Sequence, residues 1–198
     1  MAYDKFNVLT STAVPLPIEN VDTDQIIPAR FLKATERKGF GDNLFRDWRY
    51  NQDYSPKEDF VLNNPKYSGK ILVGGKNFGS GSSREHAAWS VYDYGFRCVV
   101  SSFFADIFKN NCLNIGVLPV QVSPAFLADI FAAIEKDAST ELVIDLPAQS
   151  ITIISTGASE SFDINTYKKG NMTNGFDDID YLLNIKDNIR DFAANTPL

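Results

Sequence analysis

The stretch "GGKNFGSGSSREHAA", residues 74–88, combines glycines and serines with an arginine, a glutamate and the only histidine of the chain. It follows the apolar run "KILV" and leads into a segment with helical spacing, which predicts a loop between a strand and a helix. Unpaired N–H groups and about half a positive charge at a helix N-terminus suit a carboxylate or phosphate. Glycines let the backbone approach such an anion closely. The loop is therefore a candidate anion-binding site.

Other interpretations of this loop remain open. No Gly-Lys-Ser/Thr ends it and its glycines do not form G-x-G-x-x-G, which argues against nucleotide binding. Ser82 and Glu85 have the spacing of a capping box, a purely structural role. His86 could face Ser82 or Ser83 as a Ser–His pair, but helical histidines more often bond core groups. Without a nucleophile elbow, hydrolase chemistry is a minor option.

Composition narrows the class of protein. No apolar run approaches the roughly 20 residues that span a bilayer, and the N-terminus lacks a signal-peptide pattern, so a cytoplasmic protein is expected. A net charge of −6 argues against nucleic-acid binding through a broad basic face, although a few arginines can still hold a small anion. One histidine and two distant cysteines, Cys98 and Cys112, cannot build a tetrahedral zinc site or hold an iron–sulfur cluster. Such a metal would have to come with another polypeptide.

The elements around the loop predict an α/β fold. Buried-type strands at 70–75, 96–100 and 117–122 alternate with helical spacing at 82–94 and 101–116, which implies parallel pairing with right-handed crossovers. Further expected elements are an opening strand at 5–16, a short helix in "GFGDNLFRDWRY" capped by Asp42 or Asn43, a helix opened by Ser123, a hairpin at 141–156 and a largely helical segment from Thr166. We expect a single domain over 1–198, with a core to about residue 165 and a C-terminal helical extension over about 166–198.

Two motifs carry a family resemblance. "GGKNFGSGSSREHAAWS" closely resembles the signature of the swivel domain of the aconitase superfamily, and "NVDTDQIIPARFL" resembles the other hallmark of that domain. "GFGDNLFRDWRY" resembles a segment of bacterial isopropylmalate dehydratase small subunits, and the resemblance runs through essentially the whole chain. It implies a swivelling β/β/α domain with a mixed, partly parallel sheet or barrel flanked by helices.

The resemblance also implies an activity. The family consists of hydro-lyases of leucine biosynthesis that interconvert 2-isopropylmalate and 3-isopropylmalate through 2-isopropylmaleate. It implies that this chain binds no metal or cofactor and is active only with a large subunit, which carries a [4Fe–4S] cluster. The implied assembly is a heterodimer or higher oligomer acting on a small dicarboxylic hydroxy acid, with no nucleic acid or membrane partner.

Catalytic roles follow from the matched positions. Ser82 matches the serine that acts as catalytic base, as an alkoxide, and Asp24 matches an aspartate near the active site. Asp24 also has a structural interpretation, a turn or cap at "VDTD". Ser83 and Arg84 match substrate-carboxylate contacts, for which the planar guanidinium fork is suited.

The remaining positions concern specificity and support. Arg37 is our candidate for a second substrate-binding arginine, and Arg30 competes for that role. Phe31 and Leu32 lie in a loop that distinguishes family members by substrate side chain, where they would meet an isopropyl group or face the core. The signature residues expected to support the site are Gly79, Gly81, Glu85 and His86.

Two other functions stay open at this point. The chain could serve a related hydro-lyase that acts on homoaconitate or a methylated malate, because one methylene group changes affinity for an apolar pocket by only about 1–3 kcal/mol. It could also be a dicarboxylate-binding module without catalysis.

Overall fold

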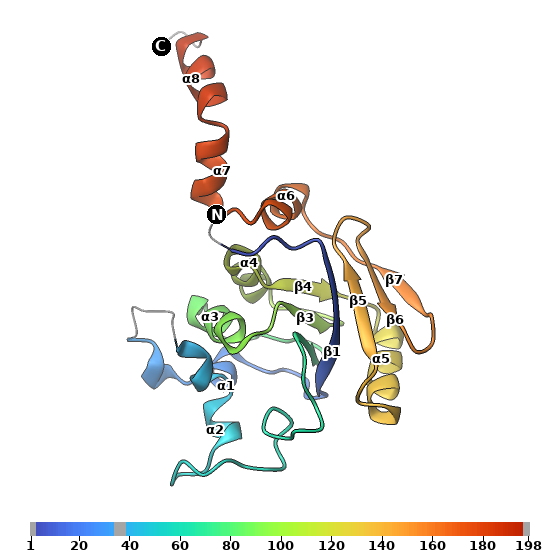
Figure 1. The fold of residues 1–198 in the computed structure, drawn as a ribbon. Helices are drawn as coiled ribbons and strands as arrows, with labels where there is room; N and C mark the ends of the chain where they lie inside the picture. The colour runs from blue at the N-terminus through green and yellow to red at the C-terminus, as the bar shows by residue number, and fades with distance from the viewer. Residues whose placement is uncertain (1–2, 34–38, 196–198) are drawn as a thin grey trace.

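The computed structural model describes residues 3–33 and 39–195. These residues form one sheet of seven strands in the order β4-β3-β2-β1-β5-β6-β7 (Figure 1). The strands are β1 (Val8–Leu16), β2 (Ile71–Gly74), β3 (Cys98–Ser101), β4 (Leu118–Gln121), β5 (Glu141–Asp145), β6 (Ser150–Ile153) and β7 (Ser159–Ser161). The first four pair in parallel and the last three continue the sheet in antiparallel pairs, starting with β5 against β1.

The helices connect and cover these strands. They are α1 (Thr23–Ile26), α2 (Arg46–Arg49), α3 (Glu85–Tyr94), α4 (Asp106–Ile115), α5 (Pro124–Lys136), α6 (Thr166–Asn174), α7 (Asp178–Asn184) and α8 (Lys186–Asn195), with two short 3-10 helices, η1 (Ala29–Phe31) and η2 (Phe40–Asn43). None of the helices in the described part of the chain combines the length and the apolar composition that a membrane crossing requires.

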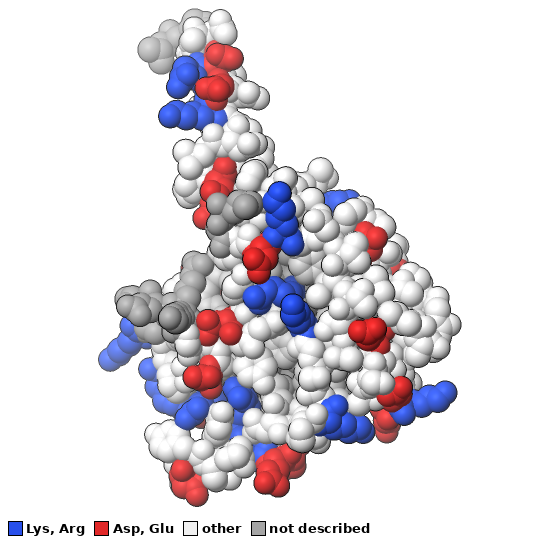
Figure 2. All heavy atoms as spheres, viewed as in Figure 1, with Lys and Arg blue, Asp and Glu red and all other residues white. Residues whose placement is uncertain are grey.

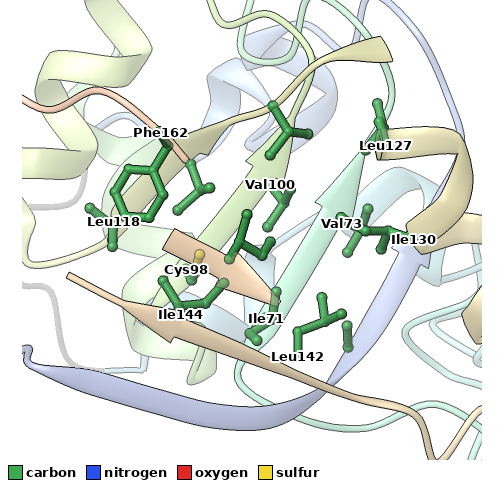
Figure 3. Close-up of a cluster of buried hydrophobic side chains, with 14 of the residues drawn as sticks. Ile71, Val73, Cys98, Val100, Leu118, Leu127, Ile130, Leu142, Ile144 and Phe162 are labelled. Carbon is green, nitrogen blue, oxygen red and sulfur yellow. The ribbon is translucent and has the colours of Figure 1, made fainter. Parts of the chain in front are cut away.

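Alternation along the strands divides the core into two clusters, one on each face of the sheet. Ile71 and Val73 belong to a cluster that includes side chains of α5, β5 and β6 (Figure 3). Leu72, between them in sequence, belongs to the other cluster, together with side chains of α3 and α4. Successive strand residues point to opposite faces, so one short apolar run supplies both clusters. This arrangement fixes α3 against the sheet and so positions the loop that precedes it.

Most of the expected elements are confirmed. The parallel strand–helix alternation, the hairpin of β5 and β6 and the helix capped by Ser123 all form, and the Ser123 hydroxyl accepts a hydrogen bond from the Phe126 amide at 3.1 Å. Strand β7 was not expected. The division at about residue 165 into a core and an extension stays a prediction.

The expected cap of the short helix in "GFGDNLFRDWRY" is wrong. Helix α2 begins after Phe45, and no side chain caps it. Asp42 and Asn43 instead belong to the 3-10 helix η2. Buried Phe45 has φ of 49° and donates its backbone N–H to the Ile26 carbonyl, so a tertiary contact rather than a cap sets where α2 begins.

Candidate active site

The two motifs identified in the sequence lie side by side. The segment that follows β1 and the glycine loop that follows β2 form an isolated parallel bridge between Asp22 and Ser80. The Gly79 amide donates to the Val21 carbonyl at 2.8 Å, and the Thr23 amide donates to the Ser80 carbonyl at 2.8 Å. Neighbouring parallel strands end at the same edge of a sheet, so chain segments far apart in sequence meet there.

Arg84 joins these motifs through its side chain. Its two terminal nitrogens form a bidentate ion pair with both carboxylate oxygens of Asp24, and its Nε donates to the Ser82 hydroxyl oxygen at 2.6 Å. The Arg84 side chain is only 14% exposed, whereas that of Asp24 is 56% exposed. A largely buried guanidinium is thus held in place by one side chain from each motif, with a longer contact of 3.5 Å to the Ile27 carbonyl.

Local structure explains why Asp24 faces the loop. Asp22 caps the short helix α1, accepting a hydrogen bond from the Gln25 amide at 2.8 Å while the Gln25 side chain accepts one from the Asp22 amide at 2.9 Å. This reciprocal pair is a capping box. It orients the first turn of α1, where Asp24 lies, towards Arg84.

The capping box expected at Ser82 and Glu85 is wrong. Helix α3 begins at Glu85, its N-cap residue is Arg84, and no side chain caps it. The Ser82 hydroxyl oxygen accepts from the Arg84 guanidinium instead. The structure therefore separates Ser82 from helix capping and assigns it to the polar cluster.

The glycines of the loop have a packing reason. Gly79 and Gly81 have φ of 78° and 94°, a region that disfavours other residues. A Cβ atom on Gly79 would lie 2.2 Å from the ring of Phe108 on α4, and one on Gly81 would lie 3.3 Å from the Thr23 hydroxyl oxygen. Glycine here lets the loop lie close to α4 and α1, in addition to any role towards an anion.

Glu85 and His86 occupy the first turn of α3. The indole N–H of Trp89 donates to the Glu85 carboxylate at 3.1 Å. The His86 ring packs against the Trp89 ring, with centroids 4.4 Å apart, and lies 5.7 Å from the Phe40 ring. Both residues thus link the site to the aromatic packing between α3 and η2.

The other predicted residues are placed differently. Arg30 forms a bidentate ion pair with Asp47 of α2, which lowers the pKa of the Asp47 carboxyl, and does not join the Arg84–Asp24 pair. Phe31 and Leu32 are half-buried and pack against the cluster that contains α3 and α4. Arg37 lies outside the described residues, and Ser83 is exposed between Ser82 and Arg84.

One residue of the site was missed in the sequence. Thr23 is buried, and its hydroxyl donates to the Ser82 carbonyl at 3.0 Å. Together with its amide bond to Ser80, this contact holds the loop on both sides of Gly81. The position of this threonine between two aspartates in "VDTD" was the available signal.

The cysteines do not fit an iron–sulfur cluster. Cys98 and Cys112 are free, fully buried and assigned to different core clusters. Burial raises the pKa of both thiols, whereas metal ligation needs accessible thiolates. Within the described ranges, no three histidine, cysteine or acidic side chains are grouped so that they could hold a metal ion.

Known proteins resemble this chain over nearly its full length. The aconitase C-terminal domain family matches residues 3–125. The 3-isopropylmalate dehydratase small subunit of Cytophaga hutchinsonii is 66% identical over 98% of this chain and 96% of its own length. The protein of the same name from Christiangramia forsetii is 62% identical over 96% of this chain and 92% of its own length.

A solved structure has the same fold. The crystal structure of 3-isopropylmalate dehydratase from Methanocaldococcus jannaschii matches with a TM-score of 0.67 at 24% identity, covering 90% of this chain and 95% of that chain. The mixed sheet flanked by helices is thus shared with the aconitase-type fold. Together with the full-length relatives, this means that the chain belongs to the family of 3-isopropylmalate dehydratase small subunits, within the aconitase superfamily.

Proposed function

We propose that this chain supplies the acid–base and carboxylate-binding half of an active site that interconverts 2-isopropylmalate and 3-isopropylmalate through 2-isopropylmaleate. The observation that carries the proposal is the position of Arg84. Its guanidinium donates to the Ser82 hydroxyl oxygen at 2.6 Å while it is paired with Asp24. The two family motifs thereby converge on one partly exposed cluster.

Ser82 is the proposed base. The proton to be removed is on the carbon next to a substrate carboxylate, so negative charge develops on the substrate as the proton leaves. A free serine hydroxyl is too weak an acid to form an alkoxide unaided, but a fixed guanidinium at hydrogen-bonding distance stabilises the oxyanion. Ser82 would accept the proton from one carbon of the substrate and return it to the other carbon of the alkene.

Arg84 and Ser83 are the proposed contacts to a substrate carboxylate. Asp24 occupies the guanidinium fork of Arg84 in the structure, so a substrate carboxylate would have to displace this half-exposed side chain. Phe31 and Leu32 are the proposed boundary of the alkyl pocket, and Arg37 is the proposed second arginine. These roles rest on the matched motifs together with the geometry around Arg84.

The proposal includes a partner. A large subunit would bring a [4Fe–4S] cluster, whose iron would act as the Lewis acid that helps the hydroxyl group to leave. The buried cysteines of this chain do not fit that cluster, which supports the proposal that the partner would carry it and would present it to the exposed Ser82. We place the assembly in the cytoplasm.

Co-expression with the cluster-bearing large subunit of the same genome, followed by purification without oxygen, tests the proposal. Formation of 2-isopropylmaleate is followed by its ultraviolet absorbance, with each subunit alone as control. We expect turnover only in the mixture. A stable complex that acts on homoaconitate or a methylated malate instead would overturn the substrate. Absence of a complex, together with calorimetric binding of dicarboxylates to this chain alone, would indicate a non-catalytic binding module.

A further inference from the structure

Helices α7 and α8 form an arm, residues 178–195, that stands away from the sheet (Figure 1). No residue of either helix is buried. The arm nevertheless carries large apolar side chains with high exposed fractions: Ile179 at 64%, Leu182 at 48%, Leu183 at 63% and Ile189 at 45%. Such a concentration of exposed apolar surface on a projecting element marks an interaction site.

The apolar residues share one side of the arm. Ile179, Leu182 and Leu183 follow the i, i+3, i+4 spacing of a helix face, and Ile189 comes two turns after Leu182. We call these four residues the arm face. Four aspartates, one lysine and one arginine occupy other positions, and Figure 2 shows blue and red side chains over α8 and a largely uncharged surface with some red over α7.

The arm is held firmly at its base. The Asp178 carboxylate accepts hydrogen bonds from the Lys168 ammonium group and from the Tyr167 hydroxyl, both at 2.9 Å. The Tyr167 ring packs edge-on against Tyr181, with centroids 4.6 Å apart, and Asp177 caps α7. The first turn of the arm is therefore oriented relative to α6, and the arm face is presented in a defined direction.

We propose that the arm face docks on the cluster-bearing large subunit, in an apolar groove bordered by basic side chains; this inference rests on the proposed function. Helices of seven and ten residues are marginally stable in water unless an amphipathic face is packed. The large subunit would supply that packing. The basic border follows from the charge of the arm: its four aspartates outnumber its two basic residues, and Lys168 at the base offsets one of them, which leaves a net charge of −1.

Geometry favours the large subunit over a second copy of this chain. The base of the arm reaches α3 through Tyr3, whose amide donates to the Gly175 carbonyl and whose ring packs against Tyr92. The site lies at the other end of α3, which spans about 15 Å for its ten residues. One large partner can therefore cover both the site and the arm. A dimer formed through the arms of two copies of this chain would instead bring two negatively charged surfaces together.

Interface size agrees with one continuous contact. Stable protein interfaces engage roughly 20–30 residues on each side. The arm has 18 residues, 178–195, so an interface of that size would extend beyond the arm onto the rest of the chain. The arm would thus supply affinity for the large subunit, and the residues around Ser82 would act on the substrate at the same interface.

Two double variants test this inference. Leu183→Gln with Ile189→Gln removes two residues of the arm face and keeps good helix formers. Val8→Gln with Ile154→Gln is the matched control, because these residues are 57% and 50% exposed, Val8 in β1 and Ile154 directly after β6. Each variant is titrated into a fixed amount of large subunit, with turnover as one readout and sedimentation of the complex as the other.

We expect the arm variant to need at least about tenfold more small subunit for half-maximal complex formation and half-maximal turnover, with unchanged turnover at saturation. The control should match the wild type. Equal titration curves for the arm variant and the wild type would overturn the inference. Sedimentation of the wild-type chain alone as a dimer that the arm variant abolishes, with unchanged binding to the large subunit, would assign the arm to a second copy. If the wild-type mixture itself shows no isopropylmalate turnover, the proposed function is wrong. Sedimentation then still tests docking of the arm.

Discussion

At the scale of single residues, the site depends on one guanidinium that bonds two side chains. Arg84 approaches the Ser82 hydroxyl oxygen with Nε and the Asp24 carboxylate with its terminal nitrogens. Lysine carries the same charge, but it has no planar fork and cannot make both contacts in this geometry. The arrangement leads to predictions for Ser82 and for Arg84.

Replacing Ser82 by alanine should lower kcat by about 10²–10⁴-fold, the usual contribution of a positioned acid or base. The fold should be unaffected, because Ser82 caps no helix. The measurement is turnover of isopropylmalate by the assembled enzyme, with binding to the large subunit as a check. Ser80→Ala is the control, since Ser80 lies in the same loop and its hydroxyl makes only a long contact of 3.5 Å to the Asn20 carbonyl. Near-normal kcat in Ser82→Ala would exclude Ser82 as the base.

Replacing Arg84 by lysine should lower kcat/KM by about 10–100-fold, which corresponds to a lost hydrogen bond between charged groups. Steady-state kinetics with 3-isopropylmalate measures the effect. The comparison variant is Arg30→Lys, which disturbs the exposed ion pair with Asp47 and should change kcat/KM little. A larger loss of kcat/KM in Arg30→Lys than in Arg84→Lys would mean that Arg30, and not Arg84, contacts the substrate carboxylate.

At the scale of elements, the glycine loop is held by close packing. Gly79 combines φ of 78° with a position where a Cβ atom would lie 2.2 Å from the ring of buried Phe108. Gly157 has a similar φ of 73° but nothing within 4 Å of its Cβ position. Comparing alanine variants at the two glycines therefore separates the stability cost of backbone strain from that of crowding.

Gly79→Ala should lower the free energy of unfolding by at least about 2 kcal/mol, because strain and overpacking add. Gly157→Ala should cost about 1 kcal/mol, from backbone strain alone. Denaturant unfolding of both variants measures the difference. Equal losses of stability would mean that α4 can shift to accept the extra carbon atom, contrary to our interpretation of the loop.

The base of the arm gives a prediction that depends on pH. The hydrogen bond from Lys168 is the main cause that lowers the pKa of Asp178. Because this pKa is lower in the folded than in the unfolded chain, the contribution to stability is present above the ordinary aspartate pKa of about 3.9. It is lost as the pH falls through the lowered value.

Asp178→Asn should therefore loosen the arm at every pH at which the carboxylate is charged. We expect faster limited proteolysis near residues 175–178 with little change in the Tm of the sheet. Asp187→Asn is the control, because its side chain is 87% exposed and it pairs only with Arg190 on its own helix. Identical cleavage rates for Asp178→Asn and the wild type would show that the ion pair does not hold the arm.

At the scale of the whole molecule, the sheet separates two cores that each contain a buried thiol. Burial raises the pKa of Cys98, and burial together with the neighbouring Cys98 raises that of Cys112. Both side chains are 0% exposed. A thiol reagent can therefore reach either cysteine only when the sheet opens.

Labelling of the native chain at pH 8 should be at least about 10³-fold slower than labelling of the unfolded chain, because it requires the rare open state. The rate should rise with denaturant in parallel with the loss of circular dichroism. Mass spectrometry of peptides containing each cysteine gives the two rates separately. Rapid native labelling of one cysteine alone would mean that one face of the sheet opens locally.

Much of this protein follows from the sequence by itself. The parallel strands, their alternation with helices, the cap at Ser123 and the hairpin depend on residues that are close together in the chain, and all of them form as expected. The two motifs also identified the family and selected Ser82, Arg84 and Asp24. Spacing over a few residues contains this information because hydrogen bonds and side-chain contacts within helices and strands are local.

Only the tertiary structure decided how the selected residues are used. Ser82 and Glu85 have the spacing of a cap, yet Ser82 bonds to Arg84, which is held by Asp24 at a separation of 60 residues. Thr23 bonds to the loop and so belongs to the site, whereas Arg30 pairs with Asp47 instead. The apolar residues of α7 and α8 lie on an exposed arm. The physical reason is the adjacency of β1 and β2, which brings together two segments that no local pattern connects.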